Sequence, residues 1–192
     1  CLDLEVRMAG GNIQVIDDFL SKEDFKLVHD YIMSAEFPWY WNNVVYQEQN
    51  VEERRRQEND TTNYYLIHLL YRSIANQYNF TNVVMSPSFD MIIKKFDKKL
   101  QIKKLDRMKV NCYPGHEKLS QHGWHVDLVA GKSINKGALF SLNTCDGYTS
   151  FKTGEKIDSV ANRMILFDPN EEHSSTNTTN AKRRVNINFN YH

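Results

Sequence analysis

The stretch RRVNINFNY, residues 183–191, alternates between apolar and polar side chains and decides the fold. Neighbouring side chains of a β-strand point to opposite faces of a sheet, so each face of this strand would have its own character. One face would carry Val185 and the apolar or aromatic residues that alternate after it. The other would carry Arg184 followed by three asparagines. The apolar face is expected to pack against helices, which leaves the polar face inside a barrel.

An arginine that points into a barrel indicates a bound anion. The planar guanidinium of Arg184 would hold a carboxylate through two parallel hydrogen bonds. Arg183, on the opposite face, is the alternative anion ligand. A surface arginine on an edge strand is the plainer interpretation, and the sequence alone leaves it open.

Five shorter stretches with strand character precede this one and are separated by turn signals. They cover residues 107–113, 137–143, 148–151, 156–161 and 163–168. The sequences CDG and KTGEK between them favour hairpin connections, and DPNEEH favours a tighter corner. Such a run of short antiparallel strands is typical of a sandwich or barrel.

The first hundred residues are predicted to be mainly helical. Ser21 is expected to cap a helix over residues 21–32, and apolar periodicity predicts two more over 62–78 and 87–100. We therefore expect one α+β domain over residues 1–192. A helical support region, 1–105, would cover one face of the antiparallel strands of 106–192.

Composition narrows the classes of partner. The 24 Lys and Arg residues balance 24 Asp and Glu residues, which gives no electrostatic reason to expect nucleic acid or an anionic membrane. No apolar run reaches the roughly 18 residues of a membrane span. The three cysteines have neither metal-site nor disulfide-framework spacing, which favours a reducing cytoplasm. The chain begins at Cys1 rather than Met, so removal of a leader stays open.

The sequence QHGWHVD, residues 121–127, has two histidines and an aspartate close together. In a strand, His125 and Asp127 would point to the same side, about 7 Å apart, and could share a metal ion. His122 would face the other way and is not expected to be a ligand. Because an H-x-D triplet also arises by chance in a chain of this composition, an ordinary polar loop is the alternative.

A third ligand is available in His173, at the corner after the stretch 163–168. Four predicted strands separate it from Asp127, which is enough chain to return it beside the H-x-D pair. Two imidazoles and one carboxylate on one face of an ion form the facial triad of non-haem Fe(II) oxygenases. The three open positions suit a substrate, a cosubstrate and dioxygen, whereas a zinc centre closed by four protein ligands would leave none.

Together these motifs resemble the Fe(II)- and 2-oxoglutarate-dependent dioxygenases, in particular the prolyl-4-hydroxylase-like branch. The resemblance covers about residues 106–191. It is carried by KVNCYPGHEKLSQHGWHVD, DGYTSF, NRMILFD, the lone His173 and RRVNINFNY. FPWYWNNVVY, residues 37–46, and the ending INFNY are similar to small oxygenases encoded by tailed phages of aquatic bacteria.

The resemblance implies a double-stranded β-helix, or jelly roll, with N-terminal helices packed on its major sheet. It makes three residues the Fe(II) ligands, namely His125, Asp127 and His173. Arg184 would bind the C5 carboxylate of the cosubstrate 2-oxoglutarate.

Tyr113, in CYPG, matches a tyrosine whose hydroxyl reaches the cosubstrate, although tyrosines also commonly end core strands. Ser141 stands where the resemblance leads us to expect a second cosubstrate-binding tyrosine. Because of this departure, Asn186 or Asn188 would supply part of the binding of the cosubstrate carboxylate.

The implied reaction is hydroxylation of a C–H bond with dioxygen, release of succinate and carbon dioxide, and ascorbate as an optional reductant. Asp127 argues against halogenation, because related halogenases lack this carboxylate. Base repair is disfavoured, because the chain has R-x-N from Arg184 but lacks the following arginine of nucleic acid demethylases.

A protein or peptide side chain, with proline favoured by family, is the expected substrate. A free amino acid or small metabolite is the alternative. The segments 47–60 and 128–136 are expected to shape the entrance. Two other classes stay open, a catalytically silent jelly roll used for binding and a zinc-dependent cupin-like enzyme. If the chain is phage-encoded, its place of action would be the host cytoplasm.

Overall fold

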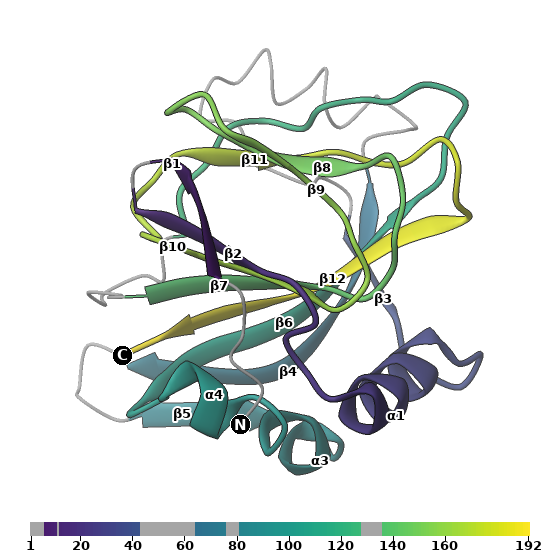
Figure 1. Cartoon of the computed structure of the whole chain (residues 1–192). Helices are drawn as coiled ribbons and strands as arrows, with labels where there is room; N and C mark the ends of the chain where they lie inside the picture. The colour runs from purple at the N-terminus through teal and green to yellow at the C-terminus, as the bar shows by residue number, and fades with distance from the viewer. Residues whose placement is uncertain (1–5, 11, 43–63, 76–80, 128–135) are drawn as a thin grey trace.

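A computed structural model describes residues 6–10, 12–42, 64–75, 81–127 and 136–192 of the chain. The described residues form two antiparallel sheets that face each other, with helices on the outer side of the larger one (Figure 1). The predicted α+β jelly roll with helices on its major sheet is confirmed. No helix among these residues is long and apolar enough to cross a membrane.

The major sheet has nine strands, in the order β1-β2-β10-β7-β12-β6-β4-β3, with β5 also paired to β4. In chain order its strands are β1 (Val6–Gly10), β2 (Ile13–Ile16), β3 (Tyr40–Asn42), β4 (Tyr65–Ala75), β5 (Thr81–Met85), β6 (Leu105–Pro114), β7 (Lys136–Ser141), β10 (Arg163–Phe167) and β12 (Arg183–Tyr191). The predicted strand of residues 183–191 is therefore confirmed. It lies between β6 and β7 near the middle of the sheet, not at an edge.

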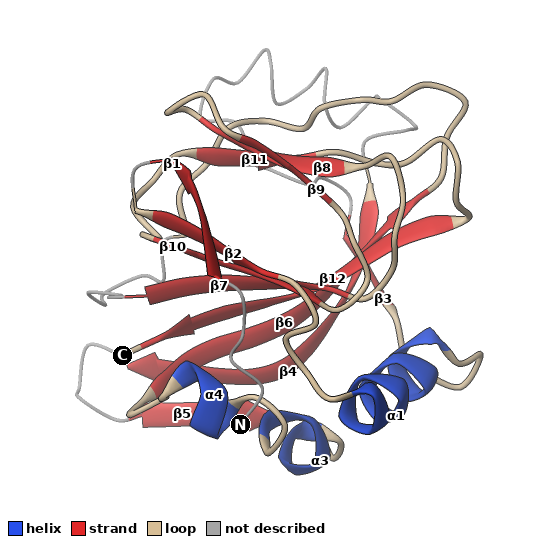
Figure 2. Ribbon diagram, viewed as in Figure 1, coloured by secondary structure: helices blue, strands red, loops and turns tan. Residues whose placement is uncertain are grey.

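The minor sheet is small and lies over the other side of the barrel (Figure 2). It contains β8 (Tyr148–Phe151), β9 (Lys156–Asp158) and β11 (His173–Ser175), in the order β11-β8-β9. Three isolated bridges join the segment after β6 to residues at or after β11, and one of them pairs His125 with His173. The minor sheet and these bridges close the barrel opposite β12 and β6.

Two hydrophobic clusters hold the layers together. The larger lies between the major sheet and the helices α1 (Lys22–Met33), α3 (Phe89–Ile93) and α4 (Asp97–Leu100). It contains Phe96, whose ring centroid is 5.0 Å from those of both Phe140 and Phe189. The smaller cluster lies inside the barrel near β8 and β10, and includes Phe151 and Phe167. The apolar face of β12 thus packs toward the helices, and its polar face is left for the barrel interior.

The first predicted helix is confirmed as α1. Ser21 caps it, accepting a hydrogen bond from the Asp24 amide at 3.1 Å. The predicted single helix over 87–100 is two short helices, α3 and α4.

The prediction of a helix over 62–78 is wrong, because its described part forms the strand β4. A bulge in β4 shifts its register against β6 between Leu69 and Tyr71. The bulge breaks the two-residue alternation, and both faces of the strand carry apolar residues, so the sequence shows no strand period. The described part of the region 1–105 therefore supplies five strands, β1 to β5, as well as helices. The predicted loop 47–60 and most of 128–136 lie outside the described residues.

Candidate metal centre

The backbone sets the spacing of two of the predicted metal ligands. His125 and His173 face each other across an antiparallel bridge, in which each amide donates to the other's carbonyl oxygen at 2.9 Å. Their imidazole centroids lie 4.5 Å apart. His125 was expected in a regular strand, but it lies in an extended segment held by this single bridge. His173 opens strand β11 and does not lie in a corner.

Asp127 completes the group. One potential ligand atom from each of His125, Asp127 and His173 can be chosen so that all three lie within 4.8 Å of one another. The Asp127 amide is bound to the Pro169 carbonyl at 3.0 Å, which joins this residue to the same corner that leads into β11. The structure therefore brings the three predicted ligands together, although they come from two distant parts of the chain.

Both imidazoles are oriented through their Nδ1 atoms. The Nδ1 of His173 lies 2.9 Å from the Glu171 carbonyl oxygen, and the Nδ1 of His125 lies 3.2 Å from the Gly123 carbonyl oxygen. A carbonyl only accepts, so each Nδ1 carries a proton and donates it, which turns Nε2 toward the position that an ion would occupy. This arrangement of ring nitrogens is the one that metal-binding histidines use.

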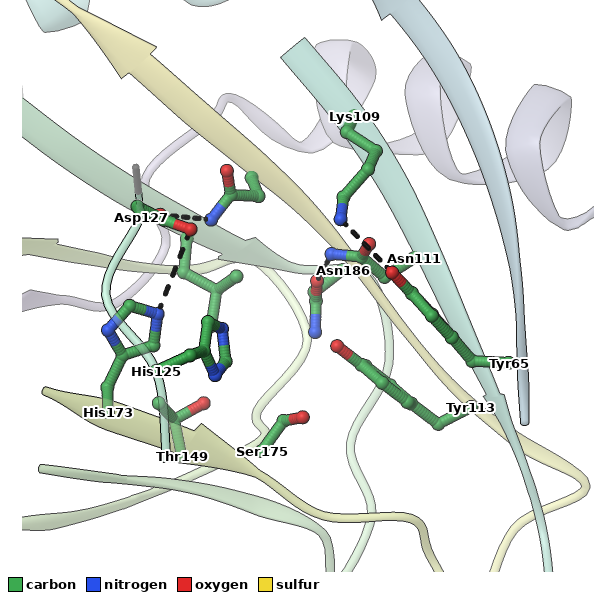
Figure 3. Close-up of a pocket in the computed structure, with 12 residues that line it drawn as sticks. Tyr65, Lys109, Asn111, Tyr113, His125, Asp127, Thr149, His173, Ser175 and Asn186 are labelled. Carbon is green, nitrogen blue, oxygen red and sulfur yellow. Dashed lines mark hydrogen bonds and ion pairs between the residues drawn. The ribbon is translucent and has the colours of Figure 1, made fainter. Parts of the chain in front are cut away.

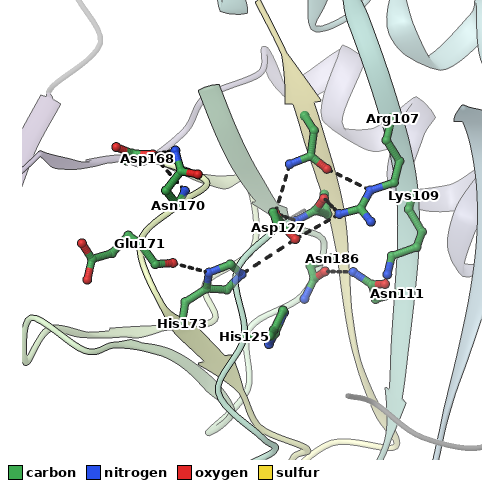
Figure 4. A network of polar contacts seen from close by, with 12 residues as sticks. Arg107, Lys109, Asn111, His125, Asp127, Asp168, Asn170, Glu171, His173 and Asn186 are labelled. Atoms are coloured by element: carbon green, nitrogen blue, oxygen red, sulfur yellow. Dashed lines mark hydrogen bonds and ion pairs between the residues drawn. The ribbon is translucent and has the colours of Figure 1, made fainter. Parts of the chain in front are cut away.

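Side chains from the major sheet surround the Asp127 carboxylate (Figure 4). Arg107 of β6 donates to Oδ1 at 3.0 Å, and Asn188 and Asn190 of β12 donate to Oδ2 at 2.9 and 3.1 Å. Arg107 also donates to the Oδ1 atoms of both asparagines, which fixes their amide orientation. Both carboxylate oxygens thus have partners before any ion binds.

The protonation states favour metal binding at neutral pH. Burial would raise the pKa of the Asp127 carboxyl, but the charge of Arg107 and the asparagine amides hold that pKa well below its usual range. Burial, and next the nearby His173, lower the pKa of His125 to about 4. An ionised carboxylate and a neutral imidazole are the forms that bind metal ions.

A cavity of about 40 Å³ extends from these ligands into the barrel (Figure 3). Its walls are mostly polar and come from both sheets. The residues that line it are Tyr65, Lys109, Asn111, Tyr113, His125, Asp127, Leu139, Thr149, His173, Ser175, Asn186 and Asn188. The metal-ligand group lies on one side of the cavity, and the tips of Lys109, Tyr65 and Tyr113 lie on the other.

Two of the predicted cosubstrate ligands, Tyr113 and Asn186, line this cavity. Asn186 accepts a hydrogen bond from Asn111 across the β12–β6 pair at 2.9 Å. Burial raises the pKa of the Tyr113 hydroxyl, which keeps it a hydrogen-bond donor. Ser141 is buried but is not among the lining residues.

Arg184 is buried next to the cavity and not on its wall. Its Nη atoms donate to the Thr149 hydroxyl at 2.8 Å and to the Thr176 carbonyl at 3.0 Å. Its Nε has no partner among the described residues. Arg183 points the other way and donates to the carbonyl of Met33, at the end of α1, at 2.7 Å. Of the two arginines, Arg184 is the one that lies beside the cavity.

His122 lies outside the group of candidate metal ligands. Its Nδ1 lies 2.8 Å from the Ser175 hydroxyl, and its ring stacks on Tyr113 with centroids 5.2 Å apart. Burial, and next the charge of Arg184, lower its pKa to about 3, so the ring is neutral. His122 supports the wall that carries Tyr113.

The sequence analysis missed several polar residues of the site. Arg107, Lys109 and Asn111 alternate in β6 with the buried apolar residues Met108 and Val110. The same alternation identified the polar face of residues 183–191, and it could have identified these. Tyr65 could not be found in this way, because its segment was predicted to be a helix.

Comparisons with solved structures support the fold. An oxidoreductase of the 2OG-Fe(II) oxygenase family from Burkholderia pseudomallei aligns with a TM-score of 0.56 and 12% sequence identity, over 86% of this chain and 77% of that one. The chain has the fold of the 2-oxoglutarate-dependent oxygenases. Neither the protein-family models nor the curated proteins include a match to its sequence.

Two prolyl hydroxylases share this oxygenase fold. The one from Trichoplax adhaerens, solved with a peptide fragment of the hypoxia inducible factor oxygen degradation domain, aligns with a TM-score of 0.60 and 15% identity, over 93% of this chain and 83% of that one. The Pseudomonas putida prolyl-4-hydroxylase aligns with a TM-score of 0.55 and 12% identity, over 93% of this chain and 91% of that one.

Proposed function

We propose that the protein is an Fe(II)- and 2-oxoglutarate-dependent dioxygenase that hydroxylates a C–H bond. The observation that carries this proposal is the meeting of His125, Asp127 and His173 at the mouth of a polar cavity in the oxygenase fold. Two imidazoles and one carboxylate suit Fe(II) and leave positions open for other ligands. When bound, Fe(II) and 2-oxoglutarate would supply the oxidant that dioxygen forms as 2-oxoglutarate is converted to succinate and carbon dioxide.

The chain's own residues would orient the reactants and exclude water. The Asp127 carboxylate, held from both sides, keeps one charge at a fixed position beside the two imidazoles. Tyr113 and Asn186 offer hydrogen bonds to the cosubstrate within the cavity. Arg184 is the proposed partner of the C5 carboxylate of 2-oxoglutarate. The burial of Arg184 beside Thr149 supports this role, and so does its Nε, which has no partner among the described residues.

A protein or peptide side chain is the proposed substrate, with a prolyl side chain first. Support comes from the Trichoplax adhaerens neighbour, which was solved with a peptide. A free amino acid or small metabolite is the alternative substrate class. The proposal places the reaction in a reducing cytoplasm, where the buried free thiols of Cys112 and Cys145 would persist.

The decisive experiment measures succinate and thermal stability together. We expect Fe(II) and 2-oxoglutarate, added without oxygen, to raise the melting temperature more than either alone, because each binds the folded state. With oxygen and a peptide library from host cells, we expect succinate and peptides heavier by one oxygen atom.

The control is His173→Ala, which we expect to remove both the cooperative stabilisation and succinate formation. A silent binding protein would show no succinate in either form, and a zinc enzyme would be indifferent to 2-oxoglutarate. Full activity of His173→Ala would contradict the proposed metal centre.

A further inference from the structure

Arg72 of β4 lies on the inner face of the major sheet. Its strand partner is Arg107 of β6, and Arg107 donates to the Asp127 carboxylate from that face. The residue before it, Tyr71, stacks on Phe89 of α3 and therefore lies on the outer face, which the helices cover. Because side chains alternate along a strand, Arg72 lies on the inner face beside Arg107.

The charge of Arg72 lacks a counterion within the described part of the chain. Its side chain is half-buried, and its Nε is buried with no hydrogen-bond partner among the described residues. The nearby Asp127 carboxylate is bound instead by Arg107 and by two asparagines of β12. A partly buried guanidinium with an unused donor is unfavourable for folding unless a ligand supplies the acceptor.

Positive charge exceeds negative charge on this inner face. Arg107 and Lys109 of β6 are the neighbours of Arg72, and among the described residues Asp127 is the only carboxylate that forms an ion pair with any of these three cations. Burial first, and then the charges of Arg107 and Arg72, lower the pKa of Lys109 to about 7, so the charge of Arg72 acts on the cavity wall. The proposed Fe(II) and dianionic 2-oxoglutarate would cancel each other's charge and leave this excess unchanged. A further anion would therefore be attracted to this face.

A groove of about 580 Å³ adjoins Arg72 on the side away from β6. Val84 of β5, the second strand partner of Arg72, lines this groove, and so does Leu69 of β4. No Asp, Glu, Lys or Arg is among the described residues that line it. Leu69 pairs in turn with Lys109, which lines the cavity beside the metal ligands. Arg72 thus lies between an uncharged groove and the metal-ligand group, where a substrate would pass.

We propose that Arg72 binds a carboxylate of the substrate and makes the enzyme selective for substrates that carry one. This inference rests on the proposed function and narrows its substrate class. The planar guanidinium can hold a carboxylate through two parallel hydrogen bonds, whereas a carboxamide of the same shape has one acceptor oxygen and no charge. Two sources fit this chemistry, an acidic side chain in a peptide and the carboxyl group of a free amino acid, and the test distinguishes them.

The test uses pairs of ligands that differ only in a carboxylate against a carboxamide. The first set is acetylated and amidated peptides with a central proline, in which Glu is exchanged for Gln at each neighbouring position. The second set is L-proline and L-prolinamide. Affinity selection on the protein loaded with Mn(II) and 2-oxoglutarate identifies the members that bind, and calorimetry gives their dissociation constants without turnover. We expect the carboxylate member of at least one pair to bind the wild type about 10- to 100-fold more tightly, the difference typical of a hydrogen bond to a charged group.

Arg72→Met is expected to abolish this preference and to leave the affinity for 2-oxoglutarate unchanged. Arg72→Lys keeps the charge without the planar fork, so it should keep the preference in part. The matched control is Arg7→Met, which removes an exposed arginine from β1 at the other edge of the sheet and keeps the wild-type preference. The ligand-free melting temperature shows whether each variant is folded, and Arg72→Gln replaces Arg72→Met if that variant does not fold.

The outcomes separate the inference from the function on which it rests. If no pair shows a preference, or if Arg72→Met keeps the preference of the wild type, Arg72 does not bind the substrate, although the oxygenase assignment stands. If Arg72→Met weakens 2-oxoglutarate binding instead, Arg72 belongs to the cosubstrate site and the inference fails. If the Mn(II)-loaded wild type does not bind 2-oxoglutarate, the proposed function fails and the inference fails with it. Loss of the preference at unchanged 2-oxoglutarate affinity supports both.

Discussion

The Asp127 carboxylate shows how single residues prepare the site. It is buried, ionised and held by an arginine and two asparagines from neighbouring strands. Such partners of a metal ligand fix its orientation and tune its affinity for the ion. The metal affinity should therefore depend on side chains that never touch the ion.

We predict that Asn188→Ala weakens metal binding about 10- to 100-fold, because Oδ2 of Asp127 loses one of its two amide donors. Titration of the metal-free protein with Mn(II) measures this. The control is Asn12→Ala, which removes an exposed amide distant in sequence from Asn188. This variant should bind Mn(II) like the wild type. Equal affinities in all three proteins would mean that the amide does not orient Asp127.

The grouping of the three candidate metal ligands was predictable from sequence, and part of the cavity wall was not. His125, Asp127 and His173 form a pattern with few chemical meanings once the strands between them are counted. Lys109 alternates with the buried apolar residues Met108 and Val110, but this alternation does not say that its face is turned inward, because a lysine in an alternating strand is usually solvent-exposed. Only the position of β6 in the middle of the sheet turns its polar face inward.

At the scale of elements, β4 and β12 explain why one strand was recognised and the other was not. β12 alternates cleanly because one face meets the helices and the other meets a polar cavity. β4 has apolar side chains on both faces and a bulge between Leu69 and Tyr71. Periodicity reports a difference between two faces, so it fails where that difference is absent.

The helical layer is held to the sheet through aromatic packing around Phe96. This side chain is fully buried and stacks on Phe19 as well as contacting Phe140 and Phe189. We predict that Phe96→Ala lowers the free energy of unfolding by about 3–5 kcal/mol, the usual range for a buried phenylalanine. Urea denaturation measures it. Met91→Ala, at an exposed position of α3, should change the free energy by less than about 0.5 kcal/mol.

Gly147, just before β8, lies against the side chain of Arg184. A Cβ at this position would lie 2.5 Å from the Asn177 carbonyl oxygen and 2.6 Å from Cδ of Arg184. We predict that Gly147→Ala displaces Arg184 and weakens 2-oxoglutarate binding while Mn(II) affinity stays near that of the wild type. Calorimetric titration with each ligand separates the two effects. Unchanged 2-oxoglutarate affinity would show that the position of Arg184 does not matter to the cosubstrate.

At the scale of the whole molecule, the metal-ligand group joins the two sheets. His173 belongs to β11 of the minor sheet, whereas Asp127 is hydrogen-bonded to β6 and β12 of the major sheet. An ion bound to both would connect the two layers directly. Metal binding is therefore expected to stabilise the entire barrel.

We predict that a saturating divalent metal raises the urea midpoint of the wild type and leaves the m-value unchanged, because the same surface is exposed on unfolding. Added chelator should reverse the rise, and His173→Ala should not show it. A change in m would mean that the metal-free protein is already partly unfolded.

The antiparallel bridge between His125 and His173 has one more consequence. Backbone hydrogen bonds set the distance between the two histidines, so no ion is needed to bring them together. In the metal-free protein the two imidazoles are therefore already in place. Metal binding then requires little more than replacement of the ion's hydration water by imidazole nitrogens. We expect the protein to tolerate repeated stripping and reloading, with its circular dichroism spectrum the same in each cycle.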